Sequence, residues 1–557
     1  MFDRHDGGRL VAKTLAAAGV RHLFCLQGGH IDSLLYGCLN EGIAVVDTRH
    51  EQAAAHMAEG WALATGETGV CAVTAGPGIT DAVTGIANAH MSLSPMLTIS
   101  GARPLAQADT WPLQDLDQLE MVKPITKWAR TCTTADRCGE YTTAALTQAR
   151  SGRPGPAYLN IPLDVLFATT PESTPIAAPV EAAAPAPDPD VLALVAGVLA
   201  ASERPIVVAG SGAHWAGAGP ALARLAETAG LPVFSLNAGR GVLADTHEWS
   251  FGPTLPIGGA FGDALAADVV VVLGARIGFT LLNGAFFRTK TVIRVDLDAA
   301  EMGRNLAGAY NVVADARVFC EQLAAGWEGG ISAARARWGD RLRESAEKNR
   351  QNVVNQFTGA GASGVVHPFE LVHAIDEVAG PEATLVSDGG DIMTWSAIAF
   401  TARGPGRFLS ISTYLGCLGV GIPFALAAKL ARPDQPVFLL EGDGSFGLNA
   451  MEFDTAVRHG LAFVCIVGND GSWGMSRHGQ GLQFGYDQLV ATELGVRPYH
   501  QMVEALGGYG EYVDDPAHLR AAIERAVASG LPACVNVAID PAVYSPMTAA
   551  MAAAGVG

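Results

Sequence analysis

Two aspartates stand in glycine-rich segments that each follow a short apolar run. Asp443 lies in the segment 441–447 (EGDGSFG), after the strand-like run 436–440, and Asp470 lies in 468–474 (GNDGSWG), after the run 462–467. A strand, a glycine-rich turn and a helix form a phosphate-binding arrangement, because glycines let helix-start N–H groups approach an anion. Carboxylate oxygens at two neighbouring strand ends suit Mg²⁺, which can bridge a protein to a diphosphate. For Gly442-Asp-Gly444 alone, the alternative is a tight turn.

Glu51 is a second candidate for chemistry. It follows the strand-like run 43–46 and the segment Asp47-Thr-Arg-His, and it opens a helix of small residues that extends to Thr65. A structural interpretation is a helix-start carboxylate favoured by the helix dipole. In the catalytic interpretation, apolar surroundings favour the protonated carboxyl, which can then share a proton with a bound base.

The elements that must position these residues form three blocks, at 1–170, 190–330 and 365–545. In each block, short β-branched strands alternate with alanine-rich helices, which predicts an α/β fold of doubly wound parallel sheets covered on both faces. The Pro- and Ala-rich segment 171–190 predicts an extended connector. A charge-dense stretch, 335–356, predicts an exposed helix, and the Gly-rich stretch 358–364 follows it.

Composition excludes several classes of protein. Hydrophobic residues make up 49% and charged residues 16% of the 557 residues, which is typical of a large globular enzyme. A formal net charge of −19 would repel nucleic acid and anionic membranes, so neither is expected as a partner. The nine cysteines include no CxxC pair, and the N-terminus is polar, so we expect reduced thiols in a cytoplasmic, soluble protein.

Taken together, the motifs resemble those of thiamine diphosphate (ThDP) enzymes, in the branch of acetolactate synthase, benzaldehyde lyase and 2-hydroxyacyl-CoA lyase, with benzaldehyde lyase as the closest resemblance. The resemblance covers essentially the whole chain, as pyrimidine-binding, central and diphosphate-binding domains in the three blocks. The matching stretches are His22–Phe24, Gly28–Asp32, Asp47–Glu51, Thr74–Gly78, Pro124–Trp128, Tyr414–Gly421, Gly442–Ser445 and Ser472–Gly474.

The resemblance assigns the cofactor contacts. Asp443, Asp470 and the backbone carbonyl of Ser472 would bind Mg²⁺, although the family usually has Asn at position 470. Glu51 would face the pyrimidine of ThDP held by a neighbouring subunit, which implies a homodimer as the minimal active unit and a homotetramer as the common assembly. Leu418 would support the bent cofactor, whereas a plain core leucine is the alternative. The full cofactor set is Glu51, Thr74, Gly78, Met393, Gly416, Leu418, Gly442, Asp443, Gly444, Ser445, Asp470, Ser472, Trp473 and Gly474.

The resemblance also implies a substrate pocket. His30 and Gln114 would move protons to and from the substrate oxygen, as in benzaldehyde lyase, although a lone histidine can equally be structural. Positions that are aromatic in benzaldehyde lyase are Leu163 and Met393 here, so aliphatic or smaller substrates fit at least as well. Arg477 and His478 could meet an anionic group or form a solvated turn. The pocket set is Gly29, His30, Leu113, Gln114, Leu163, Met393, Met475, Arg477 and His478.

The central block contains Gly210-Ser-Gly212, half of a dinucleotide fingerprint, with Trp215 in place of the third glycine. FAD is therefore not expected, and binding of a CoA adenine stays open.

The predicted activity is a ThDP- and Mg²⁺-dependent lyase or carboligase for aldehydes and 2-hydroxy ketones. The alternatives are a 2-hydroxyacyl-CoA lyase that releases formyl-CoA and a carbonyl compound, an acetolactate synthase-like carboligase of pyruvate, and a non-catalytic ThDP-binding protein.

Overall fold

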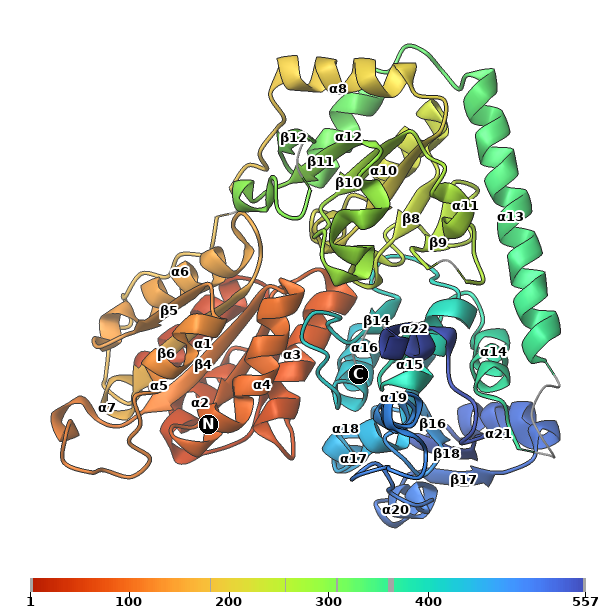
Figure 1. Cartoon of the computed structure of the whole chain (residues 1–557). Helices are drawn as coiled ribbons and strands as arrows, with labels where there is room; N and C mark the ends of the chain where they lie inside the picture. Colours follow the sequence, from red (N-terminus) through yellow and green to blue (C-terminus); the bar gives the residue numbers. More distant parts are fainter. Residues whose placement is uncertain (1–3, 181, 256, 307–308, 359–364, 554–557) are drawn as a thin grey trace. The chain divides into compact units, whose positions relative to one another are not determined.

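The apolar runs of the sequence form the strands of three six-stranded sheets, each with helices packed beside it (Figure 1). The computed structural model describes residues 4–180, 182–255, 257–306, 309–358 and 365–553. Every pairing between named strands is parallel. Parallel strands need both faces covered, which explains the nearly continuous apolar character of the runs. The predicted α/β fold with three parallel sheets is confirmed.

The first sheet has the strand order β2-β1-β3-β4-β6-β5. Its strands are β1 (His22–Cys25), β2 (Ala44–Asp47), β3 (Gly69–Val73), β4 (Met96–Ala102), β5 (Trp128–Thr131) and β6 (Pro156–Pro162). The α-helices before, between and after them are α1 (Gly7–Ala17), α2 (Asp32–Asn40), α3 (Glu51–Thr65), α4 (Pro77–Ser92), α5 (Gln118–Val122), α6 (Cys138–Arg150) and α7 (Leu163–Leu166). The short 3₁₀ helices are η1 (Gly29–Ile31), η2 (Leu105–Gln107), η3 (Lys123–Ile125) and η4 (Ala135–Arg137).

The second sheet has the order β12-β11-β10-β7-β8-β9. Its strands are β7 (Pro205–Ala209), β8 (Val233–Ser235), β9 (Ser250–Pro253), β10 (Val269–Leu273), β11 (Thr291–Asp296) and β12 (Tyr310–Val313). The helices are α8 (Pro189–Ala201), α9 (Ser211–Trp215), α10 (Gly219–Ala229), α11 (Phe261–Ala264), α12 (Ala316–Ala325) and α13 (Ala333–Phe357), with η5 (Asn237–Gly239), η6 (Phe279–Phe287) and η7 (Ala299–Glu301).

The third sheet has the order β14-β13-β15-β16-β18-β17. Its strands are β13 (Thr384–Ser387), β14 (Phe408–Ser410), β15 (Val437–Gly442), β16 (Val464–Asn469), β17 (Tyr509–Val513) and β18 (Ala533–Ala538). The helices are α14 (Pro368–Ala379), α15 (Asp391–Ala399), α16 (Gly421–Ala431), α17 (Asp443–Asn449), α18 (Glu452–His459), α19 (Gly474–Phe484), α20 (Tyr499–Ala505), α21 (Pro516–Ser529) and α22 (Pro546–Ala553).

The chain folds into two compact units. The first unit comprises Met1–Ala182, Ile411–Pro433 and Asn449–Leu461, and the second comprises Ala183–Ser410, Asp434–Leu448 and Ala462–Gly557. The first unit therefore contains the first sheet together with the helices α16 and α18, and the second unit contains the second and third sheets. The three block boundaries expected from the sequence stay a prediction.

Two sequence expectations change in detail. The charge-dense helix is α13, and it is not exposed throughout, since Arg335 and Trp338 are buried. The Arg335 guanidinium donates to the carbonyl oxygens of Ser202 (3.1 Å) and Ala229 (2.7 Å), so this cation serves as a buried cross-link.

The connector ends earlier than expected, because Asp188 caps α8. Residues 359–364 of the expected Gly-rich stretch lie outside the described residues. Within the described ranges, no helix is both long and apolar enough to cross a membrane.

Candidate active site

Asp443 and Asp470 lie at the carboxyl ends of adjacent strands in the second unit. β15 pairs with β16, with Gly442 opposite Gly468. Asp443 begins α17 directly after β15, and Asp470 follows the last residue of β16. Burial, followed by the negative charge of Asp470, raises the pKa of Asp443 to about 8. The two carboxyl groups are thus close enough to repel each other when both are ionised.

This pair has the features of a divalent-cation site. Oδ2 of Asp443 is buried and has no hydrogen-bond partner in the described part of the chain. Burial also raises the pKa of Asp470, whose Oδ1 accepts a hydrogen bond from the Ser472 N–H at 2.9 Å. A cation that prefers hard oxygen ligands would relieve both the desolvation and the repulsion. The residues present therefore fit Mg²⁺, with the Ser472 carbonyl as the third candidate ligand.

Side-chain packing explains two glycines of this region. A Cβ on Gly444 would lie 2.6 Å from Cε3 of the Trp473 ring, and one on Gly474 would lie 2.6 Å from Oδ2 of Asp470. The Ser445 hydroxyl donates to the Gly442 carbonyl at 3.0 Å and so ties the helix start to the strand end. The turn at the start of α17 is therefore a backbone surface of the kind that suits a diphosphate.

In the first unit, His30 contacts the turn Thr74–Gly78 that joins β3 to α4. Nδ1 of His30 lies 3.1 Å from Oγ1 of Thr74, and the His30 side chain is 8% exposed. Burial lowers the pKa of His30, which favours the neutral imidazole at neutral pH. A Cβ on Gly28 would lie 2.4 Å from Cβ of Thr74, so a glycine two residues before His30 is needed for this contact.

Gln114 approaches the same turn through its backbone and Cβ. A Cβ on Gly76, the N-cap of α4, would lie 2.9 Å from Cβ of Gln114. Gly76 has φ = 61° and Gln114 has φ = 60°, so both adopt the left-handed conformation that only glycine adopts without strain. Gln114 is half-buried, whereas the neighbouring Leu113 is exposed.

Glu51 borders the other end of the turn. It begins α3, its side chain is 6% exposed, and Oε1 would lie 3.5 Å from a Cβ on Gly78. Burial is the main cause that raises the pKa of Glu51, and the charge of Asp81 adds to it. The carboxyl therefore holds its proton more firmly than an exposed glutamate. Glu51, His30 and Gln114 are thus brought together around one turn.

Gln118 is a residue of this site that sequence reasoning missed. Its buried amide nitrogen donates to the Gly101 carbonyl (2.7 Å) and to Oδ1 of Asn160 (2.6 Å), and its amide oxygen accepts from the Gly76 N–H (3.2 Å). A Cβ on Gly101 would lie 2.3 Å from Cβ of His30. Gln118 therefore links the backbone of Gly101, which packs against His30, to Gly76 in the turn that Gln114 contacts. The available signal was a polar residue among the apolar positions of a short helix.

The other predicted residues of the first unit are less buried. Gly29 and Gly416 are exposed, and Leu163 and Leu418 are half-buried. Leu418 is therefore not the fully buried core leucine that the structural interpretation requires, which leaves it free to contact a ligand.

The predicted pocket residues of the second unit lie on α15 and α19. Met393 and Met475 are half-buried, and a Cβ on Gly390 would lie 2.9 Å from Cβ of Met475. Arg477 forms an ion pair with Glu493 (Nε–Oε1 3.0 Å). His478 is buried, and its Nδ1 lies 2.9 Å from the Tyr486 hydroxyl.

Asp391, at the start of α15, was also missed. Its Oδ1 accepts from the Ser545 N–H (2.8 Å) and from the Thr548 hydroxyl (2.5 Å), and its Oδ2 accepts from the Trp395 indole N–H (3.2 Å). It therefore attaches the last helix, α22, to the helix that carries Met393.

The half dinucleotide fingerprint has a packing explanation. A Cβ on Gly210 would lie 2.6 Å from Cα of Ala275, and one on Gly212 would lie 2.8 Å from Cα of Gly274. Both glycines thus allow α9 to approach the end of β10, which accounts for them without a nucleotide.

Comparison with known proteins identifies related sequences. The chain matches the thiamine pyrophosphate (ThDP) enzyme N-terminal TPP binding domain over residues 5–121, the central domain over 192–323 and the C-terminal TPP binding domain over 388–537. A protein named probable acetolactate synthase from Mycobacterium bovis is 36% identical over 553 residues, which cover 97% of this chain and 96% of that protein. The 2-hydroxyacyl-CoA lyase 2 of Homo sapiens is 33% identical over 585 residues (96% and 90%), and the 2-hydroxyacyl-CoA lyase of Arabidopsis thaliana is 31% identical over 565 residues (96% of each).

Proposed function

Because the chain belongs to the thiamine pyrophosphate enzyme family, we propose that it is a ThDP- and Mg²⁺-dependent carbon–carbon lyase or carboligase for 2-hydroxy carbonyl compounds. One observation carries this proposal: buried Glu51 and His30 border the same turn, and burial shifts their pKa values so that both favour the neutral form. A proton-holding acid and a proton-accepting imidazole are the two groups that cleavage beside a hydroxyl requires.

When bound, ThDP would supply a nucleophilic carbon for carbonyl groups and a positively charged ring that takes up the electron pair of the broken carbon–carbon bond. Glu51 holds a proton at its carboxyl for a ring nitrogen of the cofactor. Nδ1 of His30 lies 3.1 Å from Oγ1 of Thr74, and in the tautomer in which Nδ1–H donates to this hydroxyl, Nε2 would accept the proton of the substrate hydroxyl. Gln114 would bind the same oxygen through its amide. Asp443, Asp470 and Ser472 would hold the metal of the diphosphate.

For the substrate, we favour a 2-hydroxyacyl-CoA thioester, which would give formyl-CoA and a carbonyl compound. Relatives with the printed name 2-hydroxyacyl-CoA lyase cover more than nine-tenths of the chain, and neutral His30 suits a hydroxyl-bearing substrate. The second candidate is acetolactate synthase-like joining of pyruvate, which the 36% identity to the Mycobacterium bovis relative supports. Aromatic 2-hydroxy ketones are less favoured, because Leu163 and Met393 offer no ring faces for stacking.

A substrate panel with ThDP and Mg²⁺ tests the proposal. It compares a 2-hydroxyacyl-CoA, pyruvate, acetoin and benzoin, with formyl-CoA and carbon dioxide measured separately. Glu51→Gln should lower kcat by at least about 10²-fold on the best substrate. The matched control is Glu67→Gln, which removes an exposed carboxylate just beyond the other end of α3 and should leave kcat unchanged. Full activity of Glu51→Gln would refute the assignment.

We further propose that Glu51 serves ThDP held by a second copy of the chain, in a homodimer or homotetramer. Glu51→Gln and Asp443→Asn, each inactive alone, should regain part of the activity when they are unfolded and reassembled together. Mixed samples that stay inactive would argue for sites completed within one chain.

A further inference from the structure

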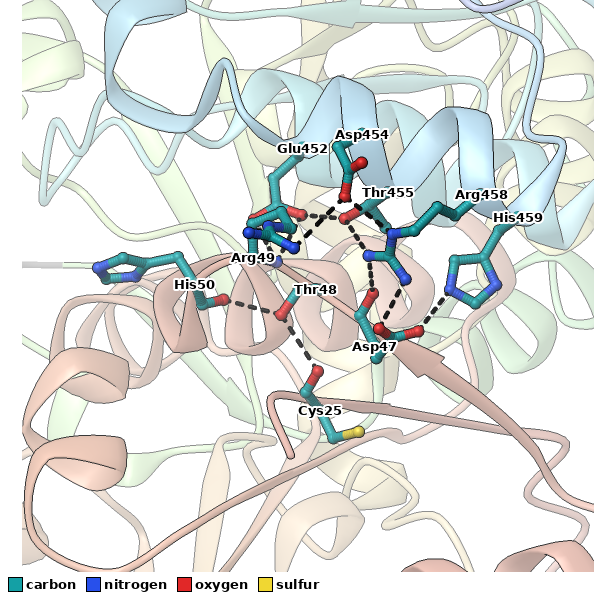
Figure 2. Close-up of polar contacts among 10 residues, drawn as sticks. All are labelled: Cys25, Asp47, Thr48, Arg49, His50, Glu452, Asp454, Thr455, Arg458 and His459. Atoms are coloured by element: carbon teal, nitrogen blue, oxygen red, sulfur yellow. Dashed lines mark hydrogen bonds and ion pairs between the residues drawn. The ribbon is translucent and has the colours of Figure 1, made fainter. Parts of the chain in front are cut away.

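The loop 47–50, which begins with the last residue of β2 and ends one residue before Glu51, is held by α18 (Figure 2). The two segments are far apart in the sequence, since Arg49 and Glu452 are 403 positions apart, yet both belong to the first unit. Thr48 is also bound to β1, because its N–H donates to the Cys25 carbonyl oxygen at 2.8 Å, and the contacts of α18 act on the residues on either side of it.

Glu452 forms the central contact. The N–H of Arg49 donates to Oε1 (3.0 Å) and Oε2 (3.1 Å) of its carboxylate, and the hydroxyl of Thr455 donates to Oε2 (2.6 Å). Glu452 is 1% exposed, so the Arg49 N–H has a buried acceptor in place of water.

Asp47, at the other end of the loop, is held by the same helix. Its Oδ2 accepts from Nη1 of Arg458 (2.6 Å), and its Oδ1 lies 2.9 Å from Nε2 of His459. Nη2 of Arg458 also donates to the Asp47 carbonyl oxygen at 3.0 Å. These side chains are partly exposed, so solvent screens their ion pairs, and the buried Glu452 contact contributes more.

Within the loop, the Thr48 hydroxyl donates to the His50 carbonyl at 2.8 Å, and the His50 side chain accepts from the Gln52 N–H at 3.1 Å. The hydrogen bonds within the loop therefore connect the residues that contact α18 to the first turn of α3. A change at Glu452 is therefore expected to reach the start of α3, from which Glu51 projects.

We propose that Glu452 is a positioning residue for Glu51: its buried carboxylate fixes the loop 47–50 through the backbone N–H of Arg49 and so sets the direction of the Glu51 side chain. This inference rests on the catalytic role proposed for Glu51. A reacting group displaced by about 1 Å can lose about 10²-fold in rate, so a residue that touches no substrate can matter for turnover.

The charged group that acts on the Glu452 carboxyl is Arg458 of its own helix, and its hydrogen-bond donors are the backbone N–H of Arg49 from the loop and the Thr455 hydroxyl. Burial raises the pKa of Glu452 to about 7, and these hydrogen bonds lower it in part. Protonation replaces one acceptor lone pair with an O–H donor, so the loop should loosen as pH falls through about 7.

The main test uses Glu452→Gln, in which an NH₂ donor faces the Arg49 N–H. In the apoenzyme, amide hydrogen exchange of the peptide 47–53 should become at least about tenfold faster. In the holoenzyme, kcat should fall about tenfold with little change in the Kd for ThDP, and the loss of kcat between pH 8 and pH 6 should disappear. Glu67→Gln is the control and should change none of these.

Thr455→Val provides a milder change, because it removes only the hydroxyl donor to Oε2; exchange of the same peptide should become about threefold faster. The inference is overturned if amide hydrogen exchange of the peptide 47–53 is unchanged in both variants. It is also overturned if kcat of Glu452→Gln still falls between pH 8 and pH 6 as it does in the wild type. If Glu51→Gln is inactive while Glu452→Gln matches the wild type, only the positioning role is wrong. If Glu51→Gln stays active, the proposed function itself is wrong.

Discussion

Gly78, in the first turn of α4, offers a sharp test of how the site is packed. A Cβ at this position would lie 2.8 Å from Cγ2 of Thr74, whereas Glu51 Oε1 would be at an ordinary 3.5 Å. Carbon atoms pack at about 3.5–4.0 Å, so Gly78→Ala must displace the Thr74 methyl group or α4. Overpacking of this kind costs about 1–3 kcal/mol, whereas the better helix propensity of alanine returns only about 0.5–1 kcal/mol.

Because the clash involves a single methyl group, a second substitution should remove it. Thr74→Ser deletes Cγ2 but keeps Oγ1, the atom that lies 3.1 Å from Nδ1 of His30. In the Thr74→Ser background, Gly78→Ala should be neutral or stabilising by about 0.5–1 kcal/mol. The two changes should therefore be coupled by about 1–3 kcal/mol in a double-mutant cycle.

Urea unfolding of the apoenzyme measures this coupling. Gly197→Ala is a suitable control, because an added Cβ in the exposed interior of α8 would meet no atom within 4 Å. It should stabilise both backgrounds equally, by about 0.5–1 kcal/mol. If Gly78→Ala changes the free energy of unfolding by the same amount with threonine or serine at position 74, the described packing of this turn is wrong.

Two further predictions concern other buried groups. Gly444→Ala places a Cβ 2.6 Å from the Trp473 ring and should weaken ThDP binding at least about tenfold in titration calorimetry, whereas Gly447→Ala, which meets no atom within 4 Å, should not. Burial raises the pKa of Glu59 to about 7, so the folded state binds the proton more tightly than the unfolded state. The folded state should therefore gain about 3 kcal/mol of stability below pH 4, and this gain should be lost as pH rises to about 7. Glu59→Gln should flatten this part of the urea midpoint profile, and a profile that stays as steep would count against a protonated Glu59.

Local pattern was sufficient for much of the fold. The helix 51–65 has the bounds that the sequence predicts, because its small residues and its ends are encoded within about one element length. The alternation of strand and helix likewise predicts parallel sheets, and placing Asp443 and Asp470 at neighbouring strand ends needs no more than that.

Tertiary structure decided which polar groups meet. Glu452, like Arg335, is a charged residue on a helix and looks solvent-facing in the sequence, yet both are buried by partners from distant segments. The sequence could suggest Glu51, His30 and Gln114 only by resemblance, since their approach to one turn depends on glycines at 28, 76 and 78 that admit close neighbours. Periodicity records which face of an element is apolar, whereas the pairing of buried donors and acceptors depends on chain segments that become adjacent only when the sheet and its helices have packed.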